Sequence, residues 1–251
     1  MIHFVGAGCG ATDLITLRGK RHIENADVII YAGSLINKEL LQYAKKECAL
    51  YDSAKMTLEE IIDVISVAER DGLVTVRLHT GDPSLYGAIG EQMRELERLG
   101  IEYDITPGVS AFSGAAASLK TEYTLPDVSQ TVIITRAAGR TDVPERENLR
   151  SLASHGATMV LYLSTGLLEK VSEDLIAGGY DAGTPAAIIY KATWPDEKVF
   201  RCTVGNLRQT AKANGITKTA LIAVGKFLES SFSRSCLYDP GFSTEFREAS
   251  K

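Results

Sequence analysis

The sequence predicts an α/β protein of two domains. Short runs rich in β-branched residues alternate with helical patterns over the first ~115 residues, which is typical of βαβ units around a parallel sheet. Several of these runs end in glycine- or proline-marked turns just before a helical pattern. The chain has 251 residues, which is enough for two domains of roughly 100–150 residues each.

The first half follows this alternation element by element. Strands are predicted over residues 2–8, 26–33, 48–53, 73–82 and 101–108. Helices are predicted over residues 37–46, 57–72, 88–100 and 109–119. The helix over 57–72 has the clearest signals, because Thr57 and Glu60 form a capping box and Gly72 is a stop.

The second half is less regular. Strands are predicted over residues 130–137, 157–164, 184–193, 198–204 and 219–225, and helices over 144–156, 167–179 and 206–215. Some of these strands adjoin without a helix between them, which favours a mixed sheet. Residues 119–129 are polar, carry Pro126 and lack periodicity, so we expect domains over 1–118 and 119–251.

Composition excludes several function classes. A net charge of −5 argues against a general nucleic-acid binder, and no apolar run approaches the ~18 residues that span a bilayer. The four cysteines form no C-x-x-C pair and none has a histidine at ligand spacing, so neither a disulfide framework nor a metal site is predicted. With no signal-peptide pattern at the start, we expect a cytoplasmic protein.

The opening stretch FVGAGCGATDL fits G-x-G-x-x-G/A, the pattern of a dinucleotide-binding turn. That fingerprint also needs an acidic residue at the end of the second strand to bind the ribose. Here the second strand ends in Tyr31, Ala32 and Gly33, without Asp or Glu. A dinucleotide site is therefore disfavoured, and the choice between a bare glycine turn and another small-molecule loop stays open.

Two further loops occupy matching positions, RLHTGDPSLYG after the strand near Leu78 and TPGVSAFSGAA after the strand near Ile105. Ligands of open α/β sheets bind at this carboxyl edge. Amides of Ser110 and Ala111 at a helix start could donate to a ligand, and Asp82 could accept from one or simply shape its turn.

Five segments resemble the tetrapyrrole methylases, the S-adenosylmethionine-dependent enzymes of corrin and sirohaem synthesis: VGAGCGATDLITLRG, RLHTGDPSLYG, TPGVSAFSGAA, ATMVLYLS and TPAAIIYKATWPDEK. The resemblance covers about residues 2–228, and longer motifs such as LPDVSQTVIITRAAGRTDVPERENL are similar to the corrin-ring branch. It implies two α/β domains with the cofactor in the cleft between them, methyl transfer to a ring carbon, and a homodimer.

By position, the resemblance implies these cofactor contacts: Cys9, Thr80, Gly81, Asp82, Leu85, Ser110, Ala111, Leu163, Ala192 and Ala220. Two departures stand out. Cys9 replaces the usual Pro of the first loop, which costs some rigidity. Ala32 replaces the Asp that uroporphyrinogen methylases carry, which argues against that substrate.

The implied chemistry is positioning, because a sulfonium donor and a nucleophilic ring carbon need alignment and no catalytic acid or base. The tetrapyrrole is anionic, and arginine pairs well with carboxylates. We expect the substrate to contact Gly8, Gly10, Tyr86, Arg136 and Arg140; further cationic candidates are Lys20, Lys55, Arg77 and Lys120. The alternatives are another ring-carbon methylase of the same pathway, an NAD-linked oxidoreductase, and a non-enzymatic binding module. Whether the substrate carries cobalt is open, but any cobalt would arrive with it.

Overall fold

The computed structural model describes residues 1–229 and 231–250, which form two compact units. The first unit contains Met1–Ala115 and Lys191–Glu197, and the second contains Ala116–Tyr190 and the chain from Lys198 onward. The division after Ala115 and the sequence-based boundary after residue 118 both fall inside helix α4 (Ala111–Leu119). The short segment Lys191–Glu197 groups with the first unit, although in the sequence it lies between two strands of the second.

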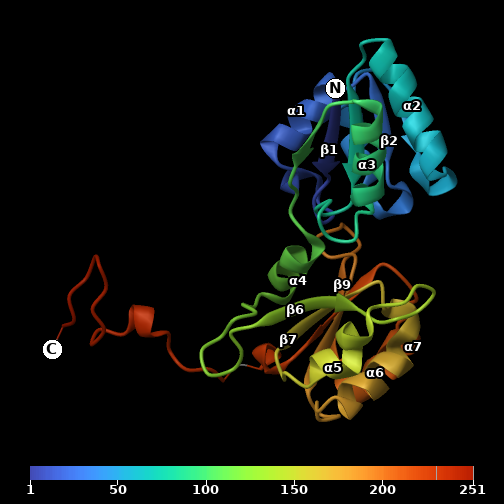
Figure 1. Ribbon diagram of the computed structural model, residues 1–251. Coiled ribbons are helices and arrows are strands. Elements are labelled where there is room, and N and C mark those ends of the chain that lie inside the picture. Colours follow the sequence, from blue (N-terminus) through green and yellow to red (C-terminus); the bar gives the residue numbers. More distant parts are fainter. Residues whose placement is uncertain (230, 251) are drawn as a thin grey trace. The chain divides into compact units, whose positions relative to one another are not determined.

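A five-stranded parallel sheet forms the centre of the first unit (Figure 1). Its strands are β1 (Ile2–Gly6), β2 (Val28–Tyr31), β3 (Ala49–Asp52), β4 (Thr75–His79) and β5 (Tyr103–Thr106). The order is β3-β2-β4-β1-β5, and every pair is parallel, as predicted. Because β4, β1 and β5 are neighbours, the loops that follow them emerge at one place on the carboxyl edge.

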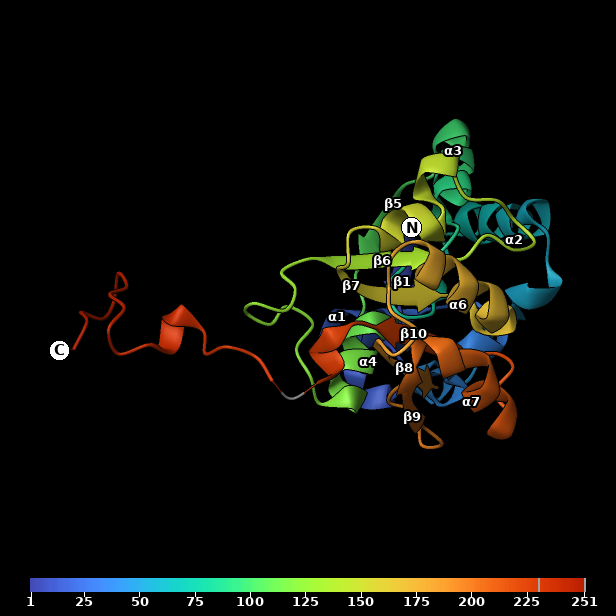
Figure 2. The ribbon, with the colours of Figure 1, turned by 90° about the horizontal axis from the view of Figure 1, so that it is seen from below.

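Helices cover both faces of this sheet. Helices α2 (Leu58–Arg70) and α3 (Ile89–Leu99) lie side by side on one face and bury Phe4 and Ile30 (Figure 1, Figure 2). Helix α2 begins with the predicted capping box. On the other face, α1 (Leu17–Asn25) and the 3-10 helix η3 (Lys38–Tyr43) pack on Val5 and Leu78.

Two of these elements differ from the sequence-based expectation. The segment predicted as a helix over 37–46 is the 3-10 helix η3. Helix α1 was not predicted, because it is short and holds Gly19, which packs against Val5 under a cap from Thr16. The remaining 3-10 turns of this unit are η1 (Thr12–Leu14), η2 (Gly33–Leu35) and η4 (Ser53–Lys55).

The second unit is built on a mixed five-stranded sheet, as predicted. Its strands are β6 (Val132–Arg136), β7 (Thr158–Tyr162), β8 (Pro185–Tyr190), β9 (Lys198–Thr203) and β10 (Ala220–Val224), in the order β6-β7-β10-β8-β9. Strands β6 and β7 are parallel, and the other pairs are antiparallel.

Helices α5 (Leu149–Ala153), α6 (Leu168–Ala177) and α7 (Leu207–Ala213) share one hydrophobic core with this sheet. The helix predicted over 144–156 is divided in two, because Asn148 caps α5 through the Ser151 amide and separates it from a 3-10 turn. The 3-10 turns are η5 (Glu145–Glu147), η6 (Thr165–Leu167), η7 (Val204–Asn206), η8 (Lys226–Leu228) and η9 (Cys236–Tyr238). Within the described residues, no helix has the length and apolarity that crossing a membrane would require.

Candidate active site

The three loops that follow β1, β4 and β5 are bonded to one another in the first unit. The amide of Gly8 donates to the carbonyl of Gly81 at 3.2 Å, and the amide of Gly81 donates back to Gly8 at 2.9 Å. A Cβ on Gly108 would lie 2.1 Å from the Gly81 carbonyl oxygen, and one on Gly6 would lie 2.5 Å from the Gly108 nitrogen. These glycines let three backbones touch where any side chain would force them apart.

The same geometry disfavours a dinucleotide turn. In that fold the glycines open the first helix, and the helix N-terminus holds the pyrophosphate. Here α1 begins only at Leu17, after the separate 3-10 turn η1. The glycines of the opening stretch therefore serve loop-to-loop packing.

Asp82 holds the second and third loops together. One carboxylate oxygen accepts from the Gly108 amide at 2.9 Å, and the other accepts from the amide of Ser84 at 2.9 Å and from the Ser84 hydroxyl. Partial burial opposes ionisation, but these hydrogen bonds outweigh it and lower the pKa of Asp82. From the sequence, Asp82 could either contact a ligand or shape its own turn. The structure shows that Asp82 shapes the turn and links it to the third loop.

The first loop is held by residues that sequence analysis missed. The indole of Trp194 packs on Gly10, where a Cβ would lie 2.1 Å from the indole Cδ1. The buried Asn37 donates its side-chain amide to the Gly10 carbonyl at 3.0 Å. Trp194 is the single tryptophan of the chain and lies in the motif TPAAIIYKATWPDEK. Its place in that motif could have marked it as a candidate site residue. Asn37 carried no signal beyond its type as a helix cap.

Thr193 fixes Cys9 and the residues beside it. The Thr193 hydroxyl accepts from the Ala11 amide at 3.0 Å and contacts the Cys9 sulfur at 3.4 Å. Gly114 of α4 leaves the space that the Cys9 side chain fills. Cys9 is buried, and burial raises the pKa of its thiol, which keeps it protonated near neutral pH. Cys9 can therefore offer a ligand its backbone but is no nucleophile.

Two predicted site residues and both neighbours of a third have left-handed backbone conformations, as do Ala88, Lys120, Asp127 and Thr219. Thr193 has φ +67°, and Lys191 has φ +48°, on either side of the buried Ala192. Tyr86 has φ +57° and Leu163 has φ +51°. Non-glycine residues adopt this region at a cost, and such outliers cluster at functional sites.

Polar side chains without partners lie at the end of β4. The Thr80 hydroxyl oxygen and the His79 Nε2 are buried, and neither has a hydrogen-bond partner among the described residues. Burial, with the neighbouring Arg77 charge, lowers the pKa of His79 to about 3, so the ring is neutral at physiological pH. The orphaned Thr80 hydroxyl has hydrogen-bonding capacity for a ligand of these loops.

Arg77 is not a substrate contact, contrary to the sequence-based candidate. Its side chain is buried beneath α3, where Nε donates to the Gln92 side-chain oxygen at 3.0 Å and a terminal nitrogen donates to the Ile30 carbonyl at 3.1 Å. Burial lowers the pKa of Arg77 to about 10, which leaves it charged.

Helix α4 begins at Ala111, so Ser110 and Ala111 stand at a helix start, as predicted. Gly81 packs against both of these residues. Leu85 closes the turn begun by Asp82. The structure thus brings together, within the first unit, the predicted residues of all three loops and Ala192.

In the second unit, the other predicted residues share one end of the sheet. Strand β6 brings Arg136 level with Tyr162, the residue before Leu163. Continuing the β7–β10 register, in which Ile222 faces Leu161, puts Ala220 level with Leu163. The side chain of Leu163 is unusually open for leucine, at 65% exposed.

Arg136, Arg140 and Leu163 line a pocket of about 700 Å³ here. The Arg136 guanidinium donates to the carbonyls of Thr141 at 3.0 Å and Asp142 at 2.5 Å, which ties down the loop after β6. Arg140 is exposed and makes no hydrogen bond or ion pair with any residue in the described part of the chain.

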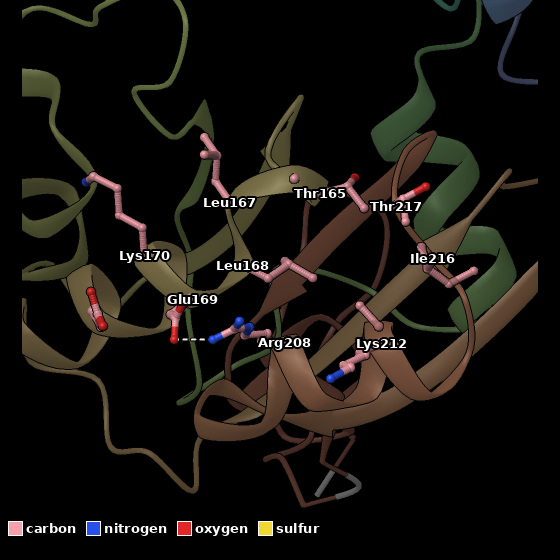
Figure 3. A pocket seen from close by; sticks show the side chains of 12 residues that line it. Thr165, Leu167, Leu168, Glu169, Lys170, Arg208, Lys212, Ile216 and Thr217 are labelled. Carbon is pink, nitrogen blue, oxygen red and sulfur yellow. Dashed lines mark hydrogen bonds and ion pairs between the residues drawn. The ribbon is translucent and has the colours of Figure 1, made fainter.

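A second pocket of about 550 Å³ lies between α6 and α7 (Figure 3). Figure 3 shows Arg208 paired with Glu169 across it, and Lys170 is paired with Asp174. It contains none of the predicted site residues, and Arg208–Glu169 is an ion pair between two of its lining residues.

Comparisons with known proteins identify the family and the fold. Residues 1–208 match the family of tetrapyrrole (corrin/porphyrin) methylases. The cobalt-precorrin-4 C(11)-methyltransferase of Methanocaldococcus jannaschii is 54% identical, over 98% of this chain and 96% of its own. The precorrin-4 C(11)-methyltransferase of Pseudomonas aeruginosa is 46% identical, over 94% of each chain. A solved cobalt precorrin-4 methyltransferase superposes with a TM-score of 0.89 at 45% identity, over 91% of this chain and 95% of that one. The chain therefore belongs to the tetrapyrrole methylase family.

Proposed function

We propose that this protein transfers a methyl group from S-adenosyl-L-methionine to carbon 11 of precorrin-4 or cobalt-precorrin-4, a step in building the corrin ring of cobalamin. The observation that carries the proposal is 54% identity over nearly the full length of both chains with a relative of that name. The match covers 98% of this chain and 96% of that relative.

The residues of the first unit fit the methyl donor. Thr80 offers a buried hydroxyl without a partner, and the glycine contacts of Gly8, Gly81 and Gly108 keep the loop surface free of side chains. We assign the donor to these loops through Cys9, Thr80, Gly81, Asp82, Leu85, Ser110, Ala111 and Ala192, and to the second unit through Leu163 and Ala220. When bound, the donor supplies a methyl group already activated by its positive sulfur.

The protein's own part is positioning. The sulfonium donor and the nucleophilic ring carbon need no protein nucleophile, and the Cys9 thiol is held protonated. The His79 ring is buried with its pKa lowered to about 3, which makes it a weak base. The loops fix the donor and exclude water, so that acceptor carbon, methyl and sulfur are aligned.

Arg140 is our choice for the contact to the substrate carboxylates, because it is the arginine of its pocket with an unused guanidinium. Arg136 positions the loop that carries Arg140. Tyr86 is the proposed acceptor contact on the first unit. Gly8 and Gly10, expected from the sequence to contact the substrate, are buried by loop packing against Gly81 and Trp194 and shape the loops instead. We further propose that the protein acts as a cytoplasmic homodimer, which resembles the family pattern.

The decisive experiment incubates the protein with donor labelled in its methyl group and with precorrin-4 or cobalt-precorrin-4 in parallel. We expect label at carbon 11, and the ratio of kcat/KM for the two acceptors identifies the natural one. Calorimetry with S-adenosylhomocysteine and with NAD is the accompanying binding test. Tight binding of NAD without binding of S-adenosylhomocysteine, or label at another ring carbon, would overturn the proposal.

A further inference from the structure

Three potential metal ligands meet on the first unit, away from the loops described above. They are His3 on β1, His22 on α1 and Asp104 on β5, and one ligand atom from each lies within 4.8 Å of the others. The β1–β5 register pairs His3 with Asp104, so these two side chains project from the same face. His3 Nδ1 lies 2.9 Å from an Asp104 carboxylate oxygen.

His22 is the member of this cluster that protein contacts do not explain. Its Nε2 is buried and has no hydrogen-bond partner among the described residues. A buried polar atom left unpaired costs about 1–3 kcal/mol, so such an atom in a native protein calls for a partner. The ring of His22 lies against that of His3, with ring centroids 3.9 Å apart and planes tilted by 30°.

The ligand types in the cluster suit a metal ion. Two imidazole nitrogens and one carboxylate are a frequent ligand set for Zn²⁺ and related divalent ions, with water completing the coordination. The Asp104 side chain is 49% exposed, which gives an ion a path from solvent.

We propose that His3, His22 and Asp104 form a binding site for a divalent transition metal ion of the Zn²⁺ type. The bound ion ties α1 to two strands of the parallel sheet, at residues that precede the carboxyl-edge loops along β1 and β5. It is separate from any metal carried by a substrate. The sequence predicted no metal site because these three ligands stand far apart along the chain and are joined only by the fold.

The test is calorimetric titration of the full, untagged chain with Zn²⁺, in a Cys236→Ser background that removes the exposed thiol as a competing ligand. We expect one equivalent bound and a rise in Tm with added Zn²⁺, because a ligand of the folded state stabilises it. His22→Ala and Asp104→Asn should each weaken binding by at least about tenfold, the loss typical even of an outer-shell partner.

His155→Ala is the matched control, since His155 is an exposed histidine of the second unit and should leave binding unchanged. Circular dichroism confirms folding, and His22→Gln replaces His22→Ala if the latter unfolds. The proposal is overturned if the parent shows no saturable Zn²⁺ binding, or if the His22 and Asp104 variants bind Zn²⁺ as tightly as the parent. Because no methyl transfer is measured, this result is independent of the catalytic assay.

Discussion

The indole of Trp194 rests on Gly10 so closely that a Cβ at Gly10 would lie 2.1 Å from Cδ1 and 2.5 Å from Nε1 of the indole. The Ala192 carbonyl oxygen would lie 2.8 Å from the same added Cβ of Gly10. The Lys191–Glu197 segment therefore packs directly on Gly10 within the first unit. We expect Gly10→Ala to displace this segment and to weaken S-adenosylhomocysteine binding, with overpacking costing about 1–3 kcal/mol in the free energy of unfolding.

Gly90→Ala is the control for that change. Gly90 lies in α3 with no atom near its would-be Cβ, so alanine should be neutral or stabilise the helix by about 0.5–1 kcal/mol. Adding Trp194→Ala to the Gly10 variant should recover part of the lost affinity by removing the clash. Calorimetry and urea unfolding of the set would contradict this account if Gly10→Ala behaved like Gly90→Ala.

Asn37 supports the same loop by a buried hydrogen bond to the Gly10 carbonyl. Asn37→Ala leaves that carbonyl without its side-chain donor, and we expect a loss of about 1–3 kcal/mol in the free energy of unfolding together with weaker S-adenosylhomocysteine binding. Asn25→Ala removes an exposed amide-to-carbonyl bond and should stay within about 0.5 kcal/mol of the parent. Equal unfolding curves for the two variants would show that Asn37 does not hold the loop.

Arg140 and Arg136 should respond differently to loss of charge. Arg140→Gln is expected to raise KM for the tetrapyrrole by about tenfold, the value of one charge-assisted hydrogen bond, while S-adenosylhomocysteine affinity is unchanged. Arg136→Gln should also lower Tm, because its guanidinium holds the loop carbonyls of Thr141 and Asp142. Arg150, an exposed arginine of α5, provides the control variant Arg150→Gln. A KM unaffected by Arg140→Gln would remove Arg140 from the substrate surface.

His79 should make the protein sensitive to acid. Its pKa is about 3 in the folded protein, against about 6.5 in the unfolded chain, so between these values only the unfolded chain binds the proton. Stability therefore falls as pH drops through this window, by up to about 1.4 kcal/mol per pH unit from this group.

His79→Leu should reduce that slope in urea unfolding between about pH 7 and about pH 4, because it removes the ring that takes up a proton only on unfolding. His22, whose pKa is also lowered, contributes in the same direction and remains in the variant. An unchanged slope in His79→Leu would mean that the ring is protonated in the folded protein.

Much of the fold was visible in the sequence, because hydrophobic periodicity is a local property. The capping box of α2, the parallel first sheet and the mixed second sheet were predicted and are confirmed. Helix α1 was missed, since nine residues with a glycine and few apolar side chains carry little periodic signal. The family was also readable from the motifs, and the comparisons confirm it.

Residue types and their order indicated which loops could approach a ligand, and Ala32 disfavoured the dinucleotide interpretation. Tertiary structure alone decided what each residue does there. Strand order β4-β1-β5 brings three loops together, Trp194 returns from a distant strand connection to cover Gly10, and Arg77 is turned into the core while Arg140 stays exposed. The reason is physical: periodicity and turn chemistry act between residues near in sequence, whereas packing, burial and hydrogen-bond partners depend on contacts between residues far apart in the chain.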